Sequence, residues 1–198
     1  MNDSNKELIL QRISHRVETL QENSDYIVGI VISIAEILAD SIKSGNKLMF
    51  CGNGGSAAES QHMAAEYCAT LDHHKPRPGI PAMSLTTDTS LITAWSNDFG
   101  FEGIFTRQIE TLGSSGDTLI AYSTSGSSKN ICMAAEAAKA KGIRVIGFAG
   151  NHDDMPLENF ADIVFKAPSK ETPIIQEIHT IVGHEVCSNV ERILFNFK

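Results

Sequence analysis

The fold class follows from one stretch, Lys47-Leu48-Met49-Phe50-Cys51-Gly52-Asn53-Gly54-Gly55-Ser56. A short apolar run leads into a glycine-rich turn, and helix-forming residues follow from Ser56 to Leu71. An apolar run without alternation is typical of a strand that is covered on both faces, as strands are in parallel sheets. We therefore expect a strand–turn–helix unit, which is the repeating piece of an α/β fold.

The same alternation continues along the chain. Further strands are expected at 81–85, 117–123, 143–148 and 162–165, with helices between them and a last helix from Pro173 to about Phe195. This order predicts an α/β protein whose parallel sheet has helices on both faces. In such sheets, ligands bind beyond the carboxyl ends of the strands.

Residues 1–44 form a helical segment of their own. Apolar residues recur at helical spacing up to Leu20, and a second helix from Tyr26 to Ile42 is apolar on nearly every face. Such a helix needs cover from several sides, so we expect the segment to serve oligomerisation. Residues 45–198 then make up the α/β domain, and both parts belong to one structural unit.

Composition narrows the classes of partner and compartment. The chain has 198 residues and a formal charge of −8, which disfavours nucleic acid as a partner. Its four cysteines contain no CxxC pair, as is usual in a reducing compartment. The start of the chain does not resemble a signal peptide, and the apolar stretch Tyr26–Ala39 is shorter than the roughly 20 residues of a membrane span. We expect a soluble, cytoplasmic protein without membrane contact.

Two loops have the composition of anion sites. Gly52–Ser56 lets a ligand approach the backbone at a helix start, but its spacing is neither that of a P-loop nor that of GxGxxG, and a plain tight turn explains it as well. Ser123–Ser128 holds four serines and a threonine between a strand and a helix. Their hydroxyl and amide groups can surround a phosphate, and the alternative is an ordinary turn with an N-cap.

Two helices carry polar stripes that could face each other. His62 and Glu66 are four residues apart, and Gln176, Thr180 and His184 follow the same spacing on the last helix. Together His62, Glu66, Gln176 and His184 could hold a divalent metal, and a Glu with a His could move a proton. The alternative for each residue alone is a surface Glu or a core His.

Other polar residues have simpler interpretations. His179 lies off the stripe of the last helix, and we expect it to be structural. Asn97 and Asp98 follow the helix that holds Trp95, where they could bind sugar hydroxyls or simply form a turn.

Taken together, these motifs resemble the phosphoheptose isomerases, which are sugar isomerase (SIS) domain proteins. The resemblance covers essentially the whole chain and rests on the order of four motifs: Cys51-Gly-Asn-Gly-Gly-Ser-Ala-Ala-Glu-Ser-Gln-His-Met-Ala-Ala-Glu66, Asn97-Asp-Phe-Gly100, Ser123-Thr-Ser-Gly126 and Gln176-Glu-Ile-His179 with His184.

This resemblance implies a fold, an assembly and a reaction. The fold is a single SIS domain, with a five-stranded parallel sheet sandwiched by helices and N-terminal helices for oligomerisation. The assembly is a homotetramer whose active sites lie at subunit interfaces. The reaction interconverts sedoheptulose 7-phosphate and D-glycero-D-manno-heptose 7-phosphate through an enediol(ate), the first step towards the activated heptose of the lipopolysaccharide core.

The resemblance also implies a role for individual residues. Glu66 and His184 form the acid/base pair, and one zinc ion per subunit is held by His62, Glu66, Gln176 and His184. Ser123, Thr124, Ser125 and Ser128 bind the phosphate. The full substrate-binding set is Asn53, Gly54, Gly55, Ser56, Glu66, Asn97, Asp98, Ser123, Thr124, Ser125, Ser128 and Gln176.

Two alternatives remain open at this point. One is a regulator that resembles these enzymes over its full length but binds the bacterial replication initiator protein without isomerase activity; the presence of Glu66 favours an enzyme instead. The other is an isomerase for a different sugar phosphate. The stretch 67–75 lacks an arginine that is typical of the heptose enzymes, which bears on the choice of sugar.

Overall fold

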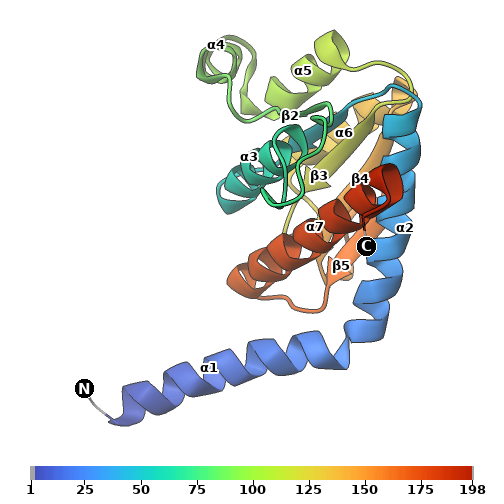
Figure 1. Ribbon diagram of the computed structural model, residues 1–198. Helices are drawn as coiled ribbons and strands as arrows, with labels where there is room; N and C mark the ends of the chain where they lie inside the picture. Colours follow the sequence, from blue (N-terminus) through green and yellow to red (C-terminus); the bar gives the residue numbers. More distant parts are fainter. Residues whose placement is uncertain (1–2, 198) are drawn as a thin grey trace.

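A five-stranded parallel sheet forms the centre of the structure, with strand order β2-β1-β3-β4-β5. The computed structural model describes residues 3–197 (Figure 1). The inner strands are buried on both faces almost throughout, because their residues are apolar in both directions. The predicted parallel sheet is thereby confirmed. The strands are β1 (Leu48–Cys51), β2 (Ala82–Ser84), β3 (Thr118–Tyr122), β4 (Arg144–Gly150) and β5 (Ile163–Ala167).

Helices cover the sheet on both faces, as expected. One layer consists of α2 (Ser24–Lys43), α3 (Gly55–Cys68) and α7 (Thr172–Phe195), which pack on alternate sheet residues such as Phe50 and Ile120. The other layer consists of α5 (Ile104–Leu112) and α6 (Lys129–Ala140), which pack on the residues between them, such as Met49 and Leu119. Alternate side chains point to opposite faces of a strand, so one run of apolar residues serves both layers. Short 3-10 helices occur at η1 (Phe101–Gly103) and η2 (Pro156–Asn159).

Helix α1 (Asp3–Glu22) is the one N-terminal helix that leaves the body of the protein. Figure 1 shows it extending sideways from the foot of α2 rather than lying on the sheet. It carries exposed apolar side chains, namely Leu8, Ile9, Leu10, Ile13 and Val17. The two expected helices are therefore present, and α1 has an uncovered apolar surface within the single chain. None of the helices in residues 3–197 is both long and apolar enough to cross a membrane.

Helix α4 (Thr89–Phe99) is longer than the sequence indicated. Asn97 and Asp98 were expected in a loop after it, but they form its last turn. The helix ends at Gly100, whose φ of +98° is a conformation that glycine adopts without strain. An Asn-Asp pair is common in turns, so its composition predicts the boundary too early.

Candidate active site

Helices α3 and α7 lie side by side and run in the same direction, which brings their polar stripes together. Thr180 donates a hydrogen bond to Oε2 of Glu59 at 2.7 Å, across a sequence separation of 121 residues. Farther along, His184 meets His62 across a separation of 122 residues. The nearly constant separation shows that the two helices are parallel and in register. The structure therefore brings His184 of the second stripe to His62 and Glu66 of the first.

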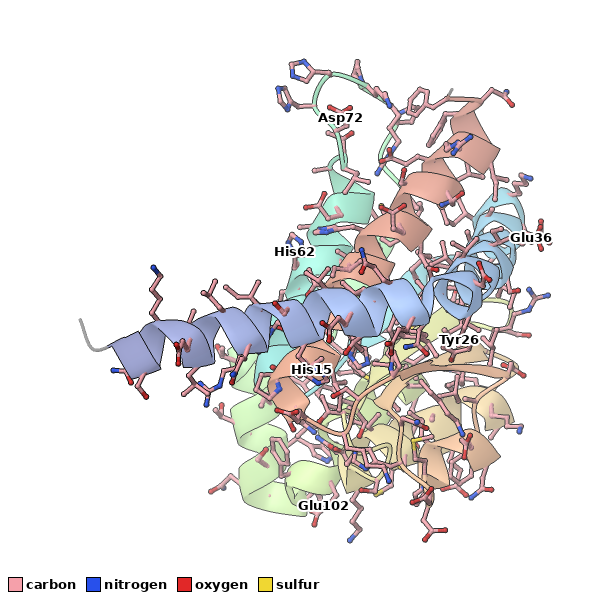
Figure 2. The ribbon with its side chains drawn as sticks, turned by 90° about the horizontal axis from the view of Figure 1, so that it is seen from below. His15, Tyr26, Glu36, His62, Asp72 and Glu102 are labelled. Carbon is pink, nitrogen blue, oxygen red and sulfur yellow. The ribbon has the colours of Figure 1, made fainter. Side chains whose placement is uncertain are left out.

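The first functional cluster consists of His62, Glu66 and His184. Nε2 of His62 and Nε2 of His184 are 2.8 Å apart, so one ring donates a hydrogen bond to the other. Nδ1 of His62 lies 3.7 Å from Oε1 of Glu66, whose side chain is 20% exposed. One ligand atom from each of the three residues lies within 4.8 Å of the others. Figure 2 shows the position of His62 on α3.

This cluster has the chemistry of a transition-metal site. Two imidazole nitrogens and a carboxylate oxygen are ligands that zinc accepts, and ligand atoms bound to one zinc ion lie about 3–3.5 Å apart. The observed spacing therefore fits a shared ion after small side-chain movements. The same three groups can also exchange a proton, because a carboxylate and two imidazoles are within reach of one another.

Gln176 lines the cleft that His62 also lines, but its amide packs elsewhere. A Cβ atom on Gly55 would lie 2.6 Å from Oε1 of Gln176, so the amide rests directly on the first turn of α3. His62 and Glu66 follow about two and three turns further along that helix. The cleft has a volume of about 420 Å³ and is lined by Gly55, Ser56, Ala58, Glu59, His62, Pro173, Gln176, Glu177, His179 and Thr180.

The serine loop follows β3 and leads into α6. The hydroxyl of Ser123 donates to that of Ser128 at 3.0 Å, and the Ser127 hydroxyl donates to that of Ser125 at 2.9 Å. Ser128 is the residue before the first turn of α6, and its side chain makes no capping hydrogen bond there. The amide groups of that turn and a set of hydroxyls thus surround the start of a helix, where anions bind favourably.

The glycine loop is tied directly to the serine loop. It follows β1, the neighbour of β3, so both loops lie at the carboxyl edge of the sheet. The amides of Asn53 and Asn130 exchange two hydrogen bonds, at 2.8 and 2.9 Å. Asn130 is buried in the first turn of α6. These bonds hold the two loops together as one surface for a ligand.

Asn97 and Asp98 are exposed at the end of α4 and bond to each other, Nδ2 of Asn97 donating to Oδ1 of Asp98 at 2.7 Å. The described residues give them no contact with the cleft in the same chain. In contrast, His179 is confirmed as a structural residue: it is 1% exposed and its Nε2 lies 3.1 Å from the carbonyl oxygen of Ala149. Burial lowers the pKa of His179 to about 4, against the weaker opposite effect of that carbonyl.

Sequence reasoning missed two residues of this region. Glu59 bridges α3 to α7, and its second oxygen, Oε1, is buried without a hydrogen-bond partner among the described residues. Its position three residues before His62 on the same helix was an available signal. Asn130 had no such signal, because only the tertiary structure brings it to Asn53.

A second group of potential ligands lies outside the cleft, on the exposed loop after α3. Asp72, His73 and His74 offer ligand atoms within 4.8 Å of one another, and Figure 2 shows this loop projecting beyond the end of the helix. Nζ of Lys75 lies 4.0 Å from the Asp72 carboxylate. Because a cation of the protein already faces that carboxylate, a metal ion is disfavoured there.

Comparison with known proteins places this geometry in a class. The family model described as SIS domain matches residues 11–150, which include both loops and the His62–Glu66 pair. The chain is thus a SIS domain protein.

Its relatives define the family more narrowly. The chain is 43% identical over 182 residues to the phosphoheptose isomerase of Burkholderia pseudomallei strain 1710b, covering 92% of this chain and 91% of the relative. It is 40% identical to that of Aneurinibacillus thermoaerophilus, covering 100% and 98%. A solved phosphoheptose isomerase structure from Francisella tularensis superimposes with a TM-score of 0.89 at 30% identity, covering 97% and 100%. The chain therefore belongs to the phosphoheptose isomerase family, as its motifs indicated.

Proposed function

We propose that the protein is an aldose–ketose isomerase that interconverts sedoheptulose 7-phosphate and D-glycero-D-manno-heptose 7-phosphate. The observation that carries this proposal is the cluster of Glu66, His62 and His184 in a chain 43% identical to a phosphoheptose isomerase over most of its length. The reaction would supply the first intermediate on the way to an activated heptose for the lipopolysaccharide core. We place it in the cytoplasm, where phosphorylated sugars are made.

Two groups must act on two neighbouring carbon atoms. In the ketose-to-aldose direction, Glu66 removes a proton from C1, and the electrons spread over C1, C2 and the C2 oxygen as an enediolate. His184 delivers a proton to C2, and the hydroxyl proton on O1 moves to O2, so atoms and charge balance. Ligand atoms of Glu66 and His184 are within 4.8 Å of each other, which suits a pair that flanks one carbon–carbon bond.

A zinc ion would be held by His62, Glu66, Gln176 and His184. What such an ion supplies when bound is polarisation of the substrate oxygens, which stabilises negative charge on them. Gln176 would have to turn away from Gly55 to join the other three ligands. Glu66 has two oxygens, so one can face a metal ion while the other faces the substrate carbon.

The phosphate would bind in the serine loop. Ser123, Thr124, Ser125 and Ser128 offer hydroxyls around the first turn of α6, which needs no Lys or Arg to attract a single phosphate group. The sugar chain would extend from there across Asn53, Gly54, Gly55 and Ser56. The φ of +54° at Gly54 keeps this turn tight and its amides accessible.

The active sites would lie between subunits of a homotetramer. Along α3, His62 is about 10 Å and Glu66 about 16 Å from Gly55, where the glycine loop that would bind the sugar ends. Asn97 and Asp98 are exposed and do not line the cleft of their own chain, so they would contact a substrate bound to a neighbour. The helical segment 1–44, with its exposed apolar face on α1, would hold the subunits of the 45–198 domain together.

Neither alternative gains support from the molecule. Glu66 lies in the cluster that an isomerase needs, and the relatives described above carry the name of the isomerase. A regulator that binds the replication initiator protein would not require that cluster. The missing arginine in residues 67–75 bears on the choice of sugar, so the assay below includes several ketose phosphates.

The test is an isomerisation assay in deuterium oxide. Purified protein is mixed with sedoheptulose 7-phosphate, with zinc or with a chelator, and the product and deuterium at C2 are followed by NMR. We expect heptose 7-phosphate with deuterium at C2. Glu66→Gln should lower kcat by about 10²–10⁴-fold, since it removes the base. The exposed Glu185, next to His184 in sequence, provides the control Glu185→Gln, which should retain full activity. Full activity in Glu66→Gln would contradict the mechanism.

A further inference from the structure

Arg77 lies in the loop between α3 and β2, yet its side chain is among the least exposed of the charged groups. It is 1% exposed, and its Nε donates a 2.6 Å hydrogen bond to Oε1 of Glu191, which is 4% exposed. Burying two charges is costly and stabilises a fold little unless further hydrogen bonds satisfy the remaining donors. The other donors of this guanidinium group therefore indicate what the pair does.

Those donors bind the end of the helix that carries the proposed base. Nη2 of Arg77 donates to the carbonyl oxygen of Glu66 at 2.8 Å, and Nη1 donates to that of Tyr67 at 2.9 Å. The last carbonyl groups of a helix have no partner within the helix. Arg77 satisfies the carbonyl group of Glu66 itself and shares that of Tyr67 with the backbone N–H of Ile80, while Nη1 also donates to the carbonyl oxygens of Ala69 and Pro78 in the loop.

Glu191 links the same point to α7. Besides Arg77, its Oε1 accepts a hydrogen bond from the backbone N–H of Leu71 at 3.3 Å, across a separation of 120 residues. This value continues the series of 121 and 122 residues at Thr180–Glu59 and His184–His62. The Arg77–Glu191 pair is thus the last link between the two helices, and the histidine pair lies between it and the Thr180–Glu59 link.

We propose that Arg77, fixed by Glu191, is a positioning residue that holds Glu66 in place relative to His62 and His184. The inference rests on the proposed function, because it assigns the purpose of the link to the reaction of that cluster. An arginine suits this task because its rigid planar fork holds its donors towards a carboxylate and carbonyl groups on two sides at once, whereas the three donors of a lysine ammonium group radiate from one nitrogen on a flexible stem.

The test separates positioning from stability. In the double variant Arg77→Met/Glu191→Met, an apolar pair replaces the charged pair, an exchange that often leaves stability unchanged or improved. We expect the double variant to remain folded but to bind Zn²⁺ about 10–100-fold more weakly in a chelator competition. Losses of this size are typical when a group that orients a metal-ligating residue is removed. We expect kcat to fall with little change in KM, because the serine loop is not affected. Arg77→Lys should keep the subunit folded without restoring Zn²⁺ affinity.

Lys47 supplies the matched control. Its Nζ lies 2.5 Å from Oδ2 of Asp117, which is 3% exposed, at the amino end of the sheet and far from the cleft. Lys47→Met removes the cation of that largely buried pair and should lower stability without changing Zn²⁺ affinity. If both Arg77 variants bind Zn²⁺ as tightly as the wild type and keep its kcat, the pair is only structural and the proposal is wrong.

A crystal structure of the double variant tests the proposal without activity or metal. We expect the 3.7 Å separation of His62 and Glu66 to change while the Thr180–Glu59 hydrogen bond stays. An unchanged cluster would overturn the inference even if the enzyme were active. A wild-type protein without isomerase activity would instead contradict the proposed function, and the movement of Glu66 would still be measurable.

Discussion

Acidification should destabilise the protein through His179, because this histidine is buried. Burial lowers the pKa of His179 to about 4 from an ordinary value of 6.5. The folded state therefore keeps a neutral ring at pH values where the unfolded chain already binds a proton. Stability is unaffected above pH 6.5, falls as the pH drops below it, and stops falling below pH 4. At about 1.4 kcal/mol per pH unit, the loss is about 3 kcal/mol by pH 4.

The contribution of this one ring can be isolated by substitution. His179→Gln retains a donor for the carbonyl oxygen of Ala149 but cannot be protonated in this range. The variant should be less stable than wild type at pH 7, because the imidazole packs 5.5–6.0 Å, between ring centroids, from Phe148, Tyr122 and Phe165. The difference in free energy of unfolding between the two proteins should shrink by about 3 kcal/mol towards pH 4. Only the wild type has a residue at position 179 that binds a proton in the unfolded state and not in the folded state.

Urea unfolding at a fixed protein concentration, repeated from pH 7 to pH 4.5, measures this gap. A fixed concentration matters because the proposed subunit association would contribute to apparent stability. His73→Gln changes an exposed histidine and serves as the control for the loss of one imidazole from the chain. A stability difference between wild type and His179→Gln that is the same at every pH would refute the reasoning, because it would mean that the buried ring does not titrate as its surroundings require.

Three further substitutions probe the site and the assembly. Gly55→Ala should lower kcat/KM by about tenfold or more in the isomerase assay, because the new methyl group would occupy the loop surface that the sugar is proposed to cross, besides displacing the amide of Gln176 from its present place. Ser128→Ala should raise KM for a phosphorylated sugar by about 10–100-fold, the value of a hydrogen bond to a charged group, and should lower stability by about 1–3 kcal/mol, because the buried Ser123 hydroxyl loses its acceptor. Ile13→Glu places a charge on the exposed apolar face of α1 and should reduce the proposed tetramer to smaller species in light scattering; a variant with the same mass in solution as the wild type would argue against that face as the interface.

The sequence was sufficient for the sheet and for the composition of each polar stripe, and the reason is periodicity. Apolar runs such as Leu48–Cys51 can only be covered on both faces, so they predict a parallel sheet directly. The four-residue spacing of His62 and Glu66 places both on one side of α3 whatever the helix packs against. Asn130 could not be found in this way, because its partner Asn53 is distant in sequence and neither residue belongs to a periodic pattern.

The contact between the two histidines depends on a residue with no side chain. Gly183 precedes His184 on α7, and a Cβ atom there would lie 2.6 Å from Sδ of Met63, the residue after His62 on α3. Because position 183 has no side chain, the two helices can approach each other closely at this level. A larger residue at position 183 would push α7 away from α3 and lengthen the 2.8 Å separation of the imidazole nitrogens. The register of the helices, and with it the cluster on which the proposed chemistry depends, is thus set by packing beside the functional residues, which no spacing rule within a single helix can express.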